Sequence, residues 1–158
     1  MDARIRPIRP EDKALLSWGL TNLSEASVHR RFLAPKPRFT DGELRYLTEV
    51  DGHDHVAFIA EDESGSLIGV GRFVRLTDDP VAAEVAIVVA DPFQGQGIGT
   101  LLGQRLADDA ARQGVLRFTA TVLSENRAAQ ALMTKLTGRL DRRVAGRGTS
   151  ALSADLAA

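Results

Sequence analysis

The segment Gln94-Gly95-Gln96-Gly97-Ile98-Gly99 lies between an apolar stretch and a stretch of helical periodicity. A helix N-terminus offers free N–H groups and a partial positive charge, and glycines let the backbone approach a ligand closely. These features together favour the binding of phosphate groups. The start of the expected helix contains no Lys or Arg, so the backbone would do most of the binding.

Two common phosphate-binding patterns fail in this segment. A P-loop requires G-x-x-x-x-G-K-[ST], which the chain lacks, and the dinucleotide pattern G-x-G-x-x-G requires glycine where Thr100 or Leu102 stands. A third pattern, Q/R-x-x-G-x-G/A, is satisfied in full by Gln94, Gly97 and Gly99. A tight turn that binds nothing is the alternative.

The flanking elements should position this turn. Residues 81–90 alternate with the period of a strand, and both faces are largely apolar, which is typical of an interior strand covered on both sides. Only the carboxylate of Glu84 interrupts this apolar stretch. A helix over 97–113 should follow, with an apolar stripe of Ile98, Leu101, Leu102 and Leu106.

The rest of the chain alternates between strand and helix patterns. Strands are expected over residues 4–8, 55–61, 67–76, 115–123, 140–144 and 150–156, and further helices after Pro10, Ser24, Thr40 and Ser124. The capping box Thr40-Asp41-Gly42-Glu43 marks one helix start. We therefore expect a single α/β (α+β) domain over residues 1–158, with a mixed sheet of about six to seven strands and about four to five helices.

Composition narrows the classes of function. The chain has 158 residues, 44% hydrophobic and 26% charged, with a net charge of −1, so nucleic acid is not an expected partner. The absence of cysteine excludes disulfides, thiolate catalysis and cysteine-based zinc sites, and we expect no metal. No apolar run approaches the ~20 residues that cross a bilayer, so we expect no membrane partner and a cytoplasmic location.

Residues 85–114 resemble the cofactor-binding core of the GNAT family of N-acetyltransferases. Residues 124–129, with Leu132 and Lys135, resemble the family's next motif. Within the family, residues 5–12, parts of 43–51, and 83–89 resemble the bacterial protein lysine acetyltransferases. The likeness covers nearly the whole chain.

The resemblance implies a GNAT-like sheet and acetyl-CoA as the co-substrate, bound by residues of the strand, the turn and the following helix. These are Ile87, Val88, Val89, Gln94, Gly95, Gln96, Gly97, Ile98, Gly99, Thr100, Asn126 and Ala129. The acceptor would be a primary amine, with a protein lysine favoured. Acetylation of a small amine (polyamine, amino acid or aminoglycoside) and a non-catalytic acyl-CoA-binding module are alternatives, and a homodimer is left open.

Acetyl transfer needs a neutral amine, whereas a lysine with a pKa near ~10.4 is mostly protonated at neutral pH. Glu84 is the candidate general base, because apolar strand surroundings should raise its pKa and its strand leads into the cofactor turn. The resemblance adds that related protein acetyltransferases use a glutamate at this position. The competing interpretation is a structural ion pair with Arg72.

Other residues complete the expected site. Backbone N–H groups near Val88 and Val89 could stabilise an oxyanion if the strand splays there, as it does in the family. Many members have a tyrosine where this chain has Met133, so no general acid is assigned. Asn126 is expected to contact the cofactor, or else to cap its helix, and Ser124 is the expected N-cap.

Overall fold

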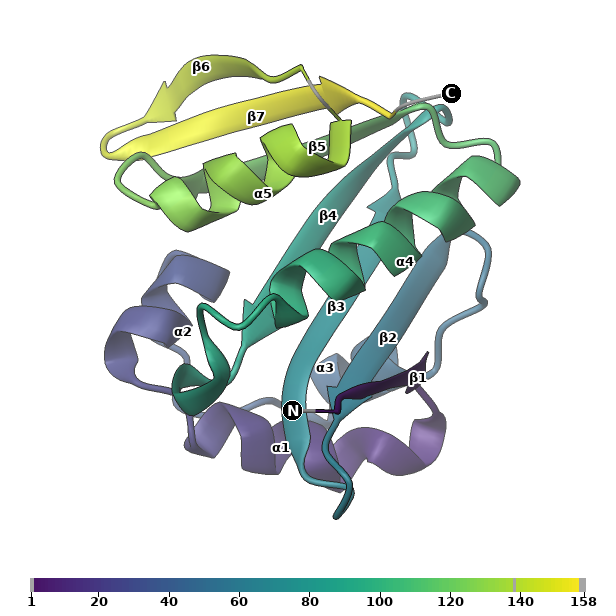
Figure 1. The fold of residues 1–158 in the computed structure, drawn as a ribbon, viewed down its shortest axis with the longest axis vertical. Helices are drawn as coiled ribbons and strands as arrows, with labels where there is room; N and C mark the ends of the chain where they lie inside the picture. Colours follow the sequence, from purple (N-terminus) through teal and green to yellow (C-terminus); the bar gives the residue numbers. More distant parts are fainter. Residues whose placement is uncertain (1, 138, 157–158) are drawn as a thin grey trace.

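A single seven-stranded sheet forms the centre of the protein, in the order β1-β2-β3-β4-β5-β7-β6 (Figure 1). The computed structural model describes residues 2–137 and 139–156. The strands are β1 (Arg4–Pro7), β2 (His55–Glu61), β3 (Leu67–Arg75), β4 (Ala82–Val89), β5 (Arg117–Leu123), β6 (Asp141–Gly146) and β7 (Thr149–Asp155). The mixed α/β class predicted from the sequence is confirmed.

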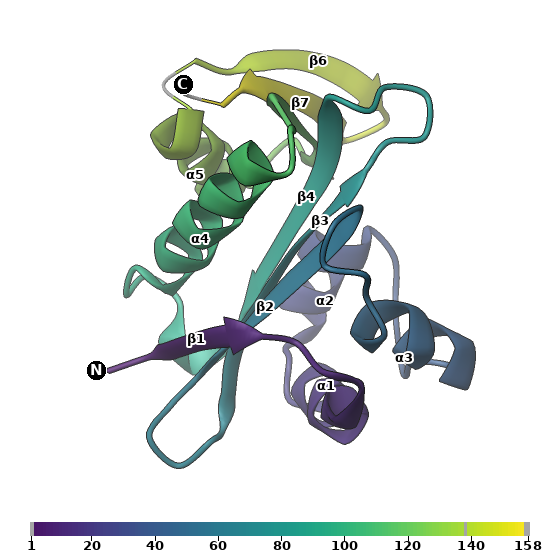
Figure 2. The ribbon, with the colours of Figure 1, turned by 90° about the vertical axis from the view of Figure 1, so that its right-hand side faces the viewer.

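Five α-helices cover the two faces of this sheet. Helices α1 (Lys13–Thr21), α2 (Glu25–Phe32) and α3 (Asp41–Thr48) lie on one face, and α4 (Ile98–Arg112) and α5 (Arg127–Thr137) on the other (Figure 2). Short 3-10 turns, η1 (Pro10–Asp12) and η2 (Asp91–Phe93), precede α1 and α4. Within the residues that the structure describes, no helix is long and apolar enough to span a membrane.

The sheet contains one parallel pair of strands, near its middle. All neighbours are antiparallel except β4 and β5, which run parallel. That parallel pairing extends only over Ala82–Glu84 and Arg117–Thr119, after which the two strands diverge. The sheet is therefore open between the second half of β4 and the rest of β5.

Helix α4 packs closely on the sheet because β3 has glycines beneath it. A Cβ atom at Gly71 would lie 2.9 Å from Leu106 Cδ1, and one at Gly69 would lie 3.0 Å from Leu102 Cδ1. Leu102 and Leu106 are fully buried, and each such side chain contributes about 1.5–3 kcal/mol. Leu101, predicted to belong to the same stripe, is instead 46% exposed, because its direction on the helix points away from the sheet.

Helix caps match the sequence at two of three places. Ser24 accepts a hydrogen bond from Ser27 N–H at the start of α2, and Thr40 and Glu43 form the predicted capping box of α3. The expected cap at Ser124 is wrong. Its hydroxyl pairs with that of Ser150 at 2.7 Å, and α5 begins later, at Arg127.

Candidate functional site

The divergence of β4 from β5 opens a cleft of about 600 Å³. Its walls are the second half of β4, the middle of β5, the start of α4 and the start of α5, with α2 across one side. A strand that loses its neighbour in mid-sheet keeps unpaired backbone groups, which need another partner. The cleft is thus a place where an extended ligand could add to the sheet.

The hydrogen bonds at the two ends of β4 show which of its residues pair with β3. Ala90 N–H donates to Ile68 C=O at 2.9 Å, and Leu76 N–H donates to Ala82 C=O at 2.9 Å. The register between β3 and β4 has no irregularity. Because hydrogen-bonded pairs alternate along antiparallel strands, even-numbered residues of β4 point their N–H and C=O groups to β3.

Odd-numbered residues of β4 therefore point these groups away from β3. Beyond Glu84, where β5 no longer pairs, the N–H groups of Ile87 and Val89 face the cleft. The N–H of Val88 belongs to the β3 ladder, so the expectation that it stabilises an oxyanion is wrong. Val88 still lines the cleft.

The glycine turn ends the cleft at the N-terminus of α4. Gly95 and Gly97 adopt left-handed backbone conformations, with φ of +77° and +85°, which L side chains rarely tolerate. Gly97 is the N-cap residue and contributes no capping side chain. The first N–H groups of α4, from Ile98 to Thr100, are left for a ligand by the geometry of a helix start.

The glutamines of the turn have structural contacts. Gln94 Nε2 donates to Val89 C=O at 2.9 Å and to Ser27 Oγ at 3.1 Å, so it ties the turn to β4 and α2. Gln96 Nε2 donates to Pro92 C=O at 3.2 Å, and Gln96 lies outside the lining of the cleft. The motif glutamine thus shapes the turn with its side chain.

Asn126 caps α5. Its Oδ1 accepts a hydrogen bond from Ala129 N–H at 3.1 Å, the contact of an N-cap with the third helical residue. Asn126 and Ala129 both line the cleft. Met133, also in the lining, is only 4% exposed and belongs to the hydrophobic core.

Glu84 lies at the point where β4 and β5 separate. Its Cα pairs with Thr119 on β5, the last pair of the parallel ladder. Its side chain is exposed, so the dry surroundings expected from its apolar neighbours in sequence are wrong. The ion pair considered with Arg72 is not found within 4.0 Å among the described residues.

The cleft receives positive charge from residues that sequence analysis missed. Arg30 and Arg31 of α2 and Arg127 of α5 line it, as does Ser27. The last turn of α2 is visibly basic in the sequence, but no local pattern indicates that this helix folds over β4. Burial lowers the pKa of Arg31, and the charge of Glu84 acts in the opposite direction.

A serine–aspartate cluster fixes α2 above the turn. Asp91 accepts hydrogen bonds from Ser24 N–H at 3.0 Å, Ser24 Oγ at 2.7 Å and Ser27 Oγ at 2.9 Å. Burial alone would raise the pKa of Asp91, but these hydrogen bonds lower it overall. The basic end of α2 is thereby held against the cleft.

Of the thirteen predicted site residues, eleven line this one cleft. They are Ile87, Val88, Val89, Gln94, Gly95, Gly97, Ile98, Gly99, Thr100, Asn126 and Ala129. The exceptions are Gln96 and Glu84. Tyr46, the only tyrosine, lies on α3, where its ring packs 4.9 Å from that of His55.

Residues 24–138 match the Acetyltransferase (GNAT) family. The chain belongs to this family. The GNAT chain is also 38% identical over 133 residues to acetyltransferase Pat of Mycolicibacterium smegmatis, a match that covers 84% of the chain and 40% of that protein. Acetyltransferase PA5475 of Pseudomonas aeruginosa is 31% identical over 135 residues, which cover 84% of the chain and 72% of that protein.

Solved structures agree with this assignment. The GNAT domain of S. lividans PAT superposes with a TM-score of 0.87 at 30% identity, over 98% of the chain and 90% of that domain. A putative acetyltransferase of Salmonella typhimurium, solved with its cofactor acetyl-CoA, shares the fold with a TM-score of 0.76 at 21% identity, over 98% of the chain and 92% of that one. The GNAT chain therefore spans about two fifths of the curated Mycolicibacterium relative and most of the S. lividans domain.

Proposed function

We propose that this GNAT chain transfers the acetyl group of acetyl-CoA to a primary amine, with a protein lysine as acceptor and Glu84 as general base. The open edge of β4 beside the uncapped start of α4 is the observation that carries the proposal. Ile87 and Val89 offer strand-like hydrogen bonds for the amides of pantetheine. The start of α4 offers N–H groups for the pyrophosphate.

The charges around the cleft fit an anionic co-substrate. Arg30 and Arg127 supply positive charge that the start of α4 lacks, and guanidinium groups suit phosphate oxygens. Acetyl-CoA would supply the thioester. The residues of the chain would hold it and direct its reactive end along β4 toward Glu84.

Glu84 would receive the proton of the attacking amine, directly or through water. A bound ammonium must lose a proton before it can attack, and a positioned carboxylate typically contributes about 10²–10⁴-fold to such a step. The exposed position of Glu84 supports a large acceptor, because a lysine on another protein could reach it without entering a closed pocket.

Binding of acetyl-CoA can be tested with a matched pair of glycine variants. Gly97 and Gly114 stand at opposite ends of α4, both with positive φ (+85° and +78°) and with open space around a Cβ atom. Asparagine tolerates this conformation better than most residues. Gly97→Asn should lower the affinity for acetyl-CoA, measured by calorimetry, at least about tenfold, since its side chain would occupy the phosphate position.

Gly114→Asn serves as the control and should bind like the wild type. Equal affinities in the two variants would contradict the assignment of the pyrophosphate to the start of α4. If acetyl-CoA binds neither the variants nor the wild type, the proposed function itself is wrong.

A further inference from the structure

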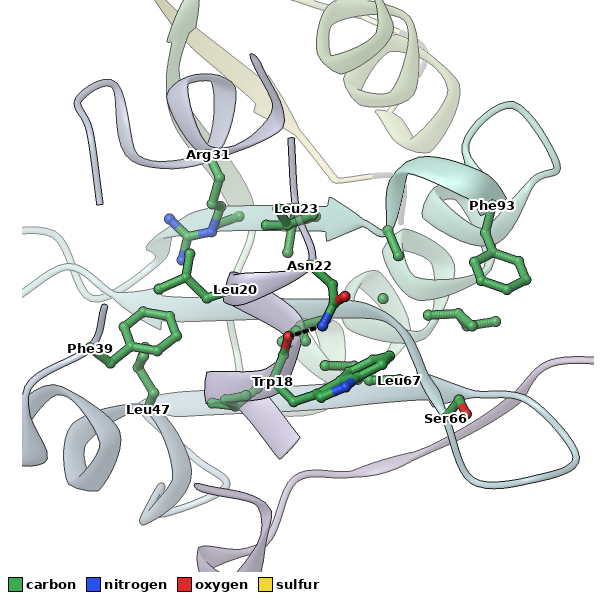
Figure 3. A pocket seen from close by; sticks show the side chains of 18 of the residues that line it. Trp18, Leu20, Asn22, Leu23, Arg31, Phe39, Leu47, Ser66, Leu67 and Phe93 are labelled. Carbon is green, nitrogen blue, oxygen red and sulfur yellow. Dashed lines mark hydrogen bonds between the residues drawn. The ribbon is translucent and has the colours of Figure 1, made fainter. Parts of the chain in front are cut away.

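A second cavity, of about 230 Å³, lies on the opposite face of the sheet from α4 (Figure 3). Residues of α1, α2 and α3 line it on one side and residues of strands β3 and β4 on the other. Its lining is mainly apolar and includes Trp18, Leu20, Leu23, Phe39, Leu67 and Phe93. Trp18 is 50% exposed and Asn22 is exposed, so the cavity opens to solvent beside α1.

Two arginines line this apolar space. Arg72, on β3, is only 6% exposed, and its Nη1 donates to Leu47 C=O at 3.0 Å and to His55 Nε2 at 2.9 Å. Its Nε and Nη2 have no recorded partner among the described residues. Arg31 extends from α2 toward the same cavity (Figure 3).

Neither arginine has a carboxylate within 4.0 Å among residues 2–137 and 139–156. Burial and the charge of Arg31 lower the pKa of Arg72 to about 10, which leaves Arg72 cationic at neutral pH, where the like charge of Arg31 repels it. Glu84 acts on Arg31 only from a greater distance. Arg72 is buried and Arg31 is half-buried, and two cations in apolar surroundings are unfavourable unless an anion compensates them.

We propose that this cavity binds a small apolar carboxylate, whose charged group pairs with Arg31 and Arg72. An inorganic anion would fit the two charges but leave the aromatic and aliphatic lining uncovered, whereas a neutral apolar molecule would leave the arginines unpaired. A cavity of about 150 Å³ lined by aliphatic and aromatic side chains can hold benzene, so this larger one can hold a branched or aromatic carboxylic acid.

The cavity and the β4–β5 cleft share Arg31, Ala86, Val88 and Phe93 in their linings. A carboxylate ligand could therefore be an amino acid whose amine reaches the cleft, or an acid that binds without reacting. The amino acid and the non-reacting acid present the same carboxylate group to the arginines. They differ in whether an amine is available for acetylation.

Trp18 is the only tryptophan of the chain, so its fluorescence reports on this cavity without acetyl-CoA. We expect 4-methylpentanoate and leucine to change the emission saturably. The neutral 4-methylpentanamide should bind at least about tenfold more weakly, because a charge-assisted hydrogen bond is roughly twice as strong as a neutral one. Equal binding of the acid and the amide, or no saturable change with either acid, would overturn the proposal.

Variants of the α2 arginines provide a matched comparison. Arg31→Gln should weaken 4-methylpentanoate binding about tenfold or more, whereas Arg30→Gln, which lines the cleft but not the cavity, should not change it. Arg72 also holds α3 to the sheet, so Arg31 is the safer site for this test. Unchanged binding in Arg31→Gln, with its fold intact by circular dichroism, would refute the arginine contact.

An acetylation assay then distinguishes an amino acid that is acetylated from an acid that binds without reacting. Acetylation of leucine in the presence of acetyl-CoA would identify the cavity as part of the acceptor site. Binding of leucine and 4-methylpentanoate without acetylation would identify a site for a non-reacting effector. Either result supports the cavity as a carboxylate site, and the fluorescence titration stands even if acetyl-CoA does not bind.

Discussion

Lowering the pH should destabilise this protein through His55, the buried first residue of β2. His55 is 8% exposed and accepts a hydrogen bond from Arg72. Burial, followed by the charge of Arg72, lowers the pKa of His55 from 6.5 to about 4. The unfolded chain therefore binds a proton between pH 6.5 and 4 that the folded chain excludes, and the free energy of unfolding falls as pH falls through this window.

The expected loss of unfolding free energy follows from the size of the pKa shift of His55. One pKa unit corresponds to about 1.4 kcal/mol, so the complete loss below pH 4 is about 3 kcal/mol, and the loss between pH 7.5 and pH 5.0 is about 2 kcal/mol. For a domain of this size, 2 kcal/mol corresponds to a fall in Tm of about 4–8 °C. Carboxylates contribute mainly below this range, because their ordinary pKa values lie near 4.

Urea unfolding at the two pH values tests the prediction. The wild type should lose about 2 kcal/mol between pH 7.5 and pH 5.0, and His55→Gln should lose little of this, because it has no imidazole to protonate. His53→Gln, at an exposed neighbouring position, is the control and should behave like the wild type. The same pH dependence in His55→Gln and the wild type would refute the assignment of the loss to His55.

Four substitutions test local features of the fold by thermal or urea unfolding. Asn126→Ala should cost about 1 kcal/mol through loss of the α5 cap, whereas Ser124→Ala should leave that cap intact. Thr40→Ala should cost about 1 kcal/mol through loss of the α3 capping box, and no change in stability would contradict it. Gly103→Ala would bring a Cβ atom within 2.8 Å of Leu136 Cδ1 and should destabilise by about 1–3 kcal/mol; a more stable variant would show that Leu136 has room to move.

Much of the fold is predictable because local patterns and tertiary packing agree. Period-two alternation marks β4, and caps at Ser24 and Thr40 mark the starts of α2 and α3. The sequence predicts Ser124 as the cap of α5, but the Ser124 hydroxyl contacts Ser150 on β7, and Asn126 caps the helix instead. A partner 26 positions away in the chain leaves no local signal.

The sequence likewise predicts only part of the candidate site. The glycine turn and β4 can be read from the sequence, since they are contiguous and their residue types match their backbone conformations. The arginines of α2 cannot, because their place over the cleft depends on Asp91 holding Ser24 and Ser27. The exposure of Glu84 also depends on tertiary structure, since β5 diverges from β4 at that residue.

The central claim is that Glu84 is the base for an acetyl transfer supported by the cleft. Its most direct test is the kcat of Glu84→Gln at saturating acetyl-CoA with a lysine-containing protein acceptor, relative to the wild type. We expect a fall in kcat of about 10²–10⁴-fold with an unchanged Kd for acetyl-CoA, because Glu84 lies outside the cofactor cleft. A kcat within about threefold of the wild type would contradict it.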